Sequence, residues 1–70
     1  MGKLPGISHL QAIKAFQRMG FEIIRQSGHV IMSDGVTTLV IPRSNPLNPY
    51  IMFSLVKAAG LTVEQFRQLL

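Results

Sequence analysis

The sequence contains no cysteine, and only three of its 70 residues are acidic. Without cysteine, neither a disulfide nor a thiolate-bound zinc ion can hold the fold, so the packing of apolar side chains must do it. A chain of this length also buries too little surface to support two cores. We therefore expect residues 1–70 to form a single domain in a reducing, cytoplasmic setting.

Long apolar runs are missing as well. No stretch approaches the roughly 18 residues of a membrane-spanning helix. Residues 1–6 hold no apolar segment of signal-peptide length before their Pro-Gly pair, so we expect no membrane association and no cleaved leader. Positive charge is in excess, because seven Lys and Arg residues against three acidic residues give a net charge of +4. This balance favours a polyanion or an acidic protein as the partner.

The first helix-start signal lies near the amino terminus. Ser8 and Gln11 have the spacing of a capping box, and the Pro5-Gly6 pair before them predicts a turn. Apolar residues then recur at helical spacing until Gly20, which can end a helix in a left-handed conformation. We therefore expect a helix that begins at His9.

From residue 21 the pattern changes to short runs of β-branched and aromatic residues. We expect three strands, over residues 21–26, 29–33 and 36–41. The dipeptides Ser27-Gly28 and Asp34-Gly35 between them are typical of tight turns. Strands with such short connections must pair antiparallel, because a parallel pair needs a crossover of about a dozen residues.

Two more helices are predicted after the strands. Pro49 suits the first turn of a helix that runs to Gly60, and Thr62 with Gln65 forms a second capping box. The predicted order is α-β-β-β-α-α, an α+β fold with a three-stranded antiparallel sheet and its helices on one face. Double-stranded-RNA-binding domains share the α-β-β-β-α order, but fold order alone does not give function.

Three stretches resemble the HicA (YcfA-like) toxin family, and together they span nearly the whole chain. The first runs from Lys3-Leu4-Pro5 through Gly20-Phe21 to Arg25-Gln26, and the second is Ser27-Gly28-His29-Val30-Ile31-Met32. The third runs from Val56 through Ala59-Gly60-Leu61-Thr62 to Phe66, with Leu69-Leu70 closing it. The resemblance implies the toxin of a type II toxin-antitoxin system. It implies a metal-independent endoribonuclease that needs no cofactor, cleaves mRNA and is neutralised by a HicB-like antitoxin.

The resemblance also implies that His29 is the catalytic residue. The implied reaction is attack of the ribose 2′-hydroxyl on the neighbouring phosphorus, and a free imidazole, with a pKa of about 6.5, can exchange protons near neutrality. His29 begins a predicted strand beside Gly28, whose backbone could approach a phosphate closely. The plain alternative is a histidine that only begins a strand.

Basic residues on three segments are candidates for binding RNA phosphates. By strict alternation, Arg25 shares a strand face with Phe21 and Ile23, close to the predicted hairpin. The other candidates are Lys14, Arg18 and Arg43. For each of them an ordinary solvated side chain is the alternative.

Departures from the family pattern support a second function. The usual serine between Gly28 and His29 is missing, and Phe53 fills a position where the family carries an arginine. The alternative is therefore a non-catalytic module that binds RNA or an antitoxin.

Two further residues have simpler interpretations. Phe53 should be exposed beside Lys57 on its helix. We interpret His9 as structural, with no metal site near it. Whether the protein self-associates stays open.

Overall fold

The computed structural model describes residues 6–70 and has the predicted order of elements. In chain order these are α1 (His9–Arg18), β1 (Glu22–Gln26), β2 (His29–Ser33), β3 (Thr38–Pro42), α2 (Pro49–Ala58) and α3 (Val63–Arg67). The sheet order is β1-β2-β3, with both pairs antiparallel. The α+β prediction is confirmed. Pro5 of the predicted turn and the Lys3-Leu4-Pro5 stretch lie outside the described residues.

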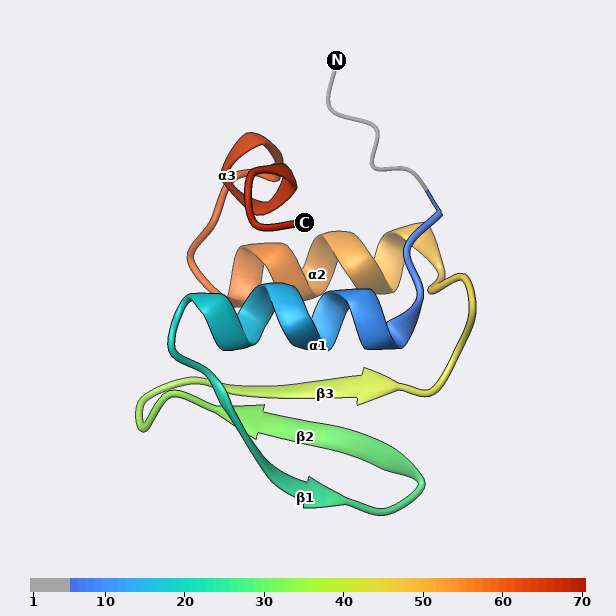
Figure 1. Ribbon diagram of the computed structural model, residues 1–70, viewed down its shortest axis with the longest axis vertical. Helices are drawn as coiled ribbons and strands as arrows, with labels where there is room; N and C mark the ends of the chain where they lie inside the picture. The colour runs from blue at the N-terminus through green and yellow to red at the C-terminus, as the bar shows by residue number, and fades with distance from the viewer. Residues whose placement is uncertain (1–5) are drawn as a thin grey trace.

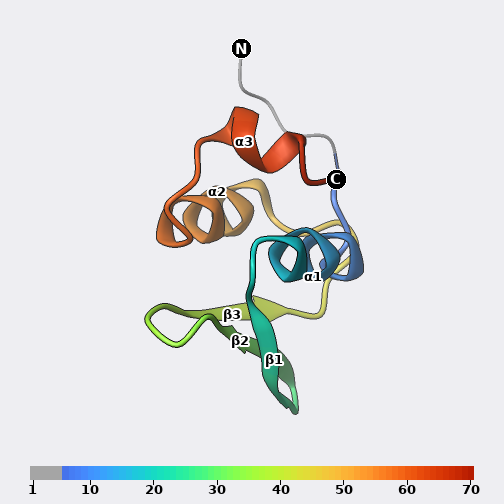
Figure 2. The same cartoon turned by 60° about the vertical axis from the view of Figure 1, so that its left-hand side comes forward.

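The helices cover one face of the sheet. Figure 1 shows α1 and α2 above the three strands, with α3 on their far side. Figure 2 shows the same layers from another direction, and in both views no element of residues 6–70 covers the lower face of the sheet. We call this lower face the open face.

Side-chain caps begin α1 and α2. Ser8 Oγ accepts a hydrogen bond from the Gln11 N–H at 3.2 Å, and Gln11 Oε1 accepts one from the Ser8 N–H at 2.9 Å. Gly20 follows α1 with φ 108°, a conformation that glycine adopts without strain. At α2, Asn48 Oδ1 accepts a hydrogen bond from the Tyr50 N–H at 2.8 Å, a cap that we did not predict.

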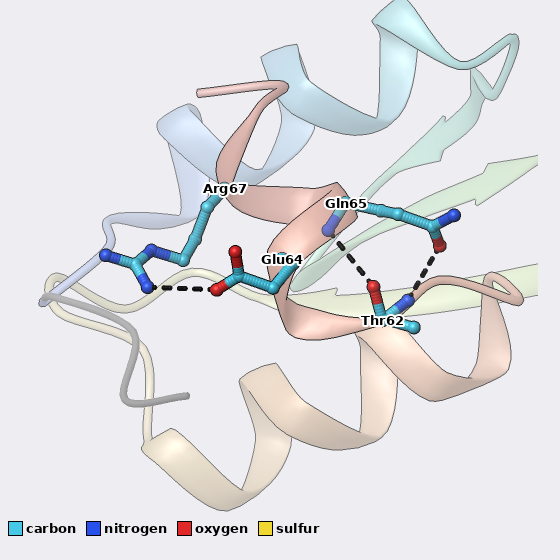
Figure 3. Close-up of polar contacts among 4 residues, drawn as sticks. All are labelled: Thr62, Glu64, Gln65 and Arg67. Atoms are coloured by element: carbon cyan, nitrogen blue, oxygen red, sulfur yellow. Dashed lines mark hydrogen bonds and ion pairs between the residues drawn. The ribbon is translucent and has the colours of Figure 1, made fainter. Parts of the chain in front are cut away.

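The capping box predicted for the last helix is also present (Figure 3). Thr62 Oγ1 accepts from the Gln65 N–H at 3.1 Å, and Gln65 Oε1 accepts from the Thr62 N–H at 2.9 Å. On the outside of α3, Arg67 Nη1 lies 3.4 Å from Glu64 Oε1. Such an exposed ion pair stabilises a fold by at most about 1 kcal/mol, so α3 depends on its caps and its buried side chain.

Phe16 lies at the centre of the core between sheet and helices. Its ring centroid is 5.9 Å from that of Phe21 and 5.2 Å from that of Phe66, so α1, the start of the sheet and α3 meet there. The sheet adds alternate buried residues from its middle and edge strands, namely Val30, Met32, Leu39 and Ile41. Helix α2 adds Met52, Leu55 and Val56 to this core, whereas Ile51 of the same helix is 38% exposed.

The third strand begins two residues later than the sequence pattern predicts. Asp34 Oδ1 accepts hydrogen bonds from the N–H groups of Val36 and Thr37, at 2.9 and 2.7 Å. Because the carboxylate takes these two N–H groups, Val36 and Thr37 belong to the turn. Thr38, which pairs with Ser33, is the first residue of β3.

Candidate functional site

His29 lies at the tip of the β1–β2 hairpin, at one end of the open face. The Ser27 N–H donates to the His29 carbonyl at 3.1 Å, which leaves Gly28 alone at the point of the turn. Val30, the next residue of β2, is buried against the helices. Since neighbouring strand residues point to opposite faces, the exposed His29 projects from the open face. Its partner in the next strand is Pro42.

Arg25 lies on the open face, and the predicted placement with Ile23 is wrong. A register shift between Ile23 and Arg25 makes Ile24 an extra residue, a β-bulge in β1. Arg25 therefore pairs with Ile31, and directly opposite residues point to the same side of a sheet. Ile31 is two positions from His29 in β2, so the arginine and the histidine share one face.

Arg43 brings a second guanidinium to the same end of the sheet. It follows Pro42, the partner of His29, and its Nε–H donates to the Ser27 carbonyl at 3.1 Å. This bond uses one of the five N–H groups of the guanidinium, and the others have the geometry to bind two phosphate oxygens. Arg43 is a candidate from the sequence because the family carries basic residues in this loop. Nothing local to Arg43 signals its contact with Ser27, 16 residues away.

Gly28 leaves the hairpin tip open to solvent. A Cβ added at this residue would meet no atom within 4 Å, and its φ is not positive. Neither steric contact within residues 6–70 nor the backbone angle therefore requires a glycine at position 28. Gly28 is exposed, and the space beside its Cα is open to solvent.

Lys14 and Arg18 belong to the opposite side of the molecule. Both are exposed on α1, which packs on the helix-covered face of the sheet. Arg18 Nη1 donates to the Leu69 carbonyl at 2.6 Å, so this arginine ties the end of the chain to α1. The fold thus places His29 and Arg25 on the open face, with Arg43 bonded to the hairpin tip at the same end of the sheet, and it separates the two α1 residues from them.

Comparison with protein families matches residues 11–61 to the model described as the HicA toxin of bacterial toxin-antitoxin. The chain belongs to the HicA toxin family. The matched residues include the whole sheet and α2, and therefore His29, Arg25 and Arg43. The family consists of toxins that pair with an antitoxin. No significant match was found among curated proteins or among solved structures.

The outer side of α2 carries exposed aromatic rings. Tyr50 is 84% exposed and Phe53 is 51% exposed, and Lys57 follows on the same side of the helix. This confirms the exposure predicted for Phe53. Exposed aromatic residues are enriched where proteins bind one another, so this surface is a second candidate binding face.

Acidic groups lie at the far end of β2 from His29. The N–H of Thr37 and then that of Val36 hold the pKa of the Asp34 carboxyl below its usual value, because they stabilise the charged form. Asp34, Glu22 and Ile24 line a shallow hollow of about 340 Å³.

Within residues 6–70, no group of three His, Asp or Glu side chains could hold a metal ion. No helix in this range has the length and apolar character to cross a membrane.

Proposed function

We propose that this member of the HicA family is an endoribonuclease that cleaves mRNA in the cytoplasm, with His29 as its acid/base catalyst. The observation that supports the proposal is one exposed imidazole on the open face, with Arg25 on the same face and Arg43 bonded to the hairpin tip. An RNA strand at this end of the open face would meet the imidazole and the Arg25 guanidinium, with Arg43 beside the hairpin tip. The net charge of +4 favours its approach.

The chemistry assigns each group a task. His29 takes the proton of a ribose 2′-hydroxyl, the 2′-oxygen attacks the adjacent phosphorus, and the bond from phosphorus to the 5′-oxygen breaks. Solvent or a second group returns a proton to the 5′-oxygen, leaving a 2′,3′-cyclic phosphate and a 5′-hydroxyl. The guanidinium groups of Arg25 and Arg43 stabilise the negative charge that gathers on the phosphate oxygens.

A pair of matched oligonucleotides tests this reaction. One is a single-stranded RNA, and the other has the same sequence with every 2′-hydroxyl replaced by hydrogen. We expect cleavage of the first only, with 2′,3′-cyclic phosphate ends, because the second lacks the nucleophile. Cleavage of both at similar rates would exclude the proposed reaction.

The exposed aromatic side of α2 favours a second candidate, a non-catalytic module that binds RNA or a HicB-like antitoxin. Tyr50 and Phe53 are too exposed to stabilise the core and suit a protein partner. This candidate predicts RNA binding that weakens steeply with salt while the RNA stays intact through long incubation. It also predicts that Phe53→Ala weakens antitoxin binding without changing RNA binding.

A further inference from the structure

One short segment, residues 42–44, contacts both histidines of the chain. His9 is the first residue of α1, and its backbone N–H donates to the Ser44 carbonyl at 3.0 Å. The His9 ring Nδ1 lies 3.2 Å from the same oxygen. A carbonyl oxygen only accepts and has two lone pairs, so Nδ1 carries the hydrogen and Ser44 receives two hydrogen bonds from one residue.

The other end of this segment holds the hairpin tip. Pro42 pairs with His29, and the Arg43 Nε–H donates to the Ser27 carbonyl at 3.1 Å. The Ser44 N–H closes the segment on itself by donating to the Pro42 carbonyl at 3.0 Å. Each residue of the segment therefore takes part in a strand pairing or a hydrogen bond, and the contacts run without a break from α1 to the hairpin.

The hairpin tip depends on such contacts because packing does not fix it. Residues 26–29 are all exposed, so no core side chain anchors the turn. Arg43 is the one side chain of residues 6–70 that hydrogen-bonds the backbone of this tip. A contact that fixes the position of Arg43 therefore also helps to fix the position of the His29 ring.

We propose that His9 is a positioning residue for His29. It holds Ser44 through its ring Nδ1–H, Ser44 fixes the adjacent Arg43, and Arg43 fixes the hairpin tip. This role rests on the proposed ribonuclease function of His29, and it gives His9 no contact with the reacting atoms. A displacement of about 1 Å at a catalytic group can cost about 10²-fold in rate, which is why a remote anchor affects cleavage.

Three substitutions of His9 separate positioning from other roles. His9→Asn keeps an N–H donor close to the place of Nδ1, His9→Gln moves the donor to the place of Nε2, and His9→Ala removes it. Alanine is well tolerated in the first turn of a helix, so α1 should persist. We expect kcat for RNA cleavage to fall about tenfold or more in His9→Ala and His9→Gln, with KM nearly unchanged, and His9→Asn to retain wild-type kcat.

Two kinetic results would overturn the inference. If His9→Ala cleaves RNA at the wild-type rate, the ring bond has no role in positioning. If His9→Asn loses as much activity as His9→Ala, the reaction needs the imidazole itself and not its Nδ1–H donor. Gln17→Ala is the matched control, because Gln17 is an exposed residue of the same helix and its loss should leave kcat unchanged.

A second measurement does not depend on RNA cleavage. The Nε–H of Arg43 gives its own signal in a ¹H–¹⁵N spectrum, and its hydrogen bond to Ser27 should slow exchange with water. We expect His9→Ala to speed this exchange and His9→Asn to leave it slow. If the signal changes as expected while wild-type protein cleaves no RNA, the positioning contact stands and the ribonuclease proposal fails. If exchange of the Arg43 Nε–H with water is the same in His9→Ala and the wild type, the proposed link from His9 to Arg43 is refuted.

Discussion

Arg25 lies directly across from Ile31, on the face of the sheet that points away from the helices. The bulge at Ile24 causes this placement, because an unbroken strand would turn Arg25 toward the core. A guanidinium buried there without a partner would be costly. The same bulge gives the face of His29 a positive charge, so a local irregularity of β1 shapes the candidate RNA site.

Replacing Arg25 should weaken RNA binding in a way that depends on salt. In Arg25→Ala, we expect the slope of log affinity against log salt to fall by about 0.7, the contribution of one phosphate contact with single-stranded nucleic acid. Filter binding over a series of salt concentrations measures this slope. Lys14→Ala removes the same charge from the helix layer and should leave the slope unchanged. If the slope falls in Lys14→Ala and not in Arg25→Ala, RNA binds at α1 and not at the open face.

Two phenylalanines should differ sharply in their effect on stability. Phe66 is fully buried against Phe16, so we expect Phe66→Ala to lower the free energy of unfolding by about 3–5 kcal/mol. Phe53 is half exposed on α2, so Phe53→Ala should change it by less than about 0.5 kcal/mol. Urea unfolding of both variants and the wild type gives the comparison. Similar losses would contradict the packing of α3 on α1.

The Asp34 turn should make stability depend on acid. The pKa of Asp34 is lowered in the folded protein by the N–H groups of Thr37 and Val36. The contribution of this carboxylate is therefore complete above its unfolded pKa of about 3.9 and is lost as the pH falls through the lower folded value. We expect wild-type protein to have a higher Tm than Asp34→Asn at neutral pH, with a gap that narrows in acid. A gap that widens in acid would contradict the assigned hydrogen bonds.

The parts of the fold that the sequence predicts are those with local causes. The capping boxes at Ser8 and Thr62 are formed by residues three positions apart, so the helix starts they predict are confirmed. The start of β3 was predicted too early, because alternating residues do not reveal that the Asp34 carboxylate takes two N–H groups. The likeness to double-stranded-RNA-binding domains stays a prediction.

The candidate site was less predictable, because its residues meet through long-range contacts. The sequence nominates His29 and Arg43, but their proximity follows from the pairing of β2 with β3 and from the bond of Arg43 to Ser27. Nothing local to His9 signals its bond to Ser44, 35 residues away. The sequence predicts that Arg18 binds RNA phosphates, because it lies on the polar side of its helix. In the structure its guanidinium donates to the Leu69 carbonyl.

The most direct test of the central claim compares RNA cleavage by wild-type protein and His29→Ala. His29 is exposed at a hairpin tip, so its loss should leave the fold and its Tm nearly unchanged. We predict that wild-type protein cleaves single-stranded RNA and that His29→Ala is slower by about 10²- to 10⁴-fold, the usual contribution of acid/base catalysis. Equal rates for the two proteins would contradict the catalytic role of His29.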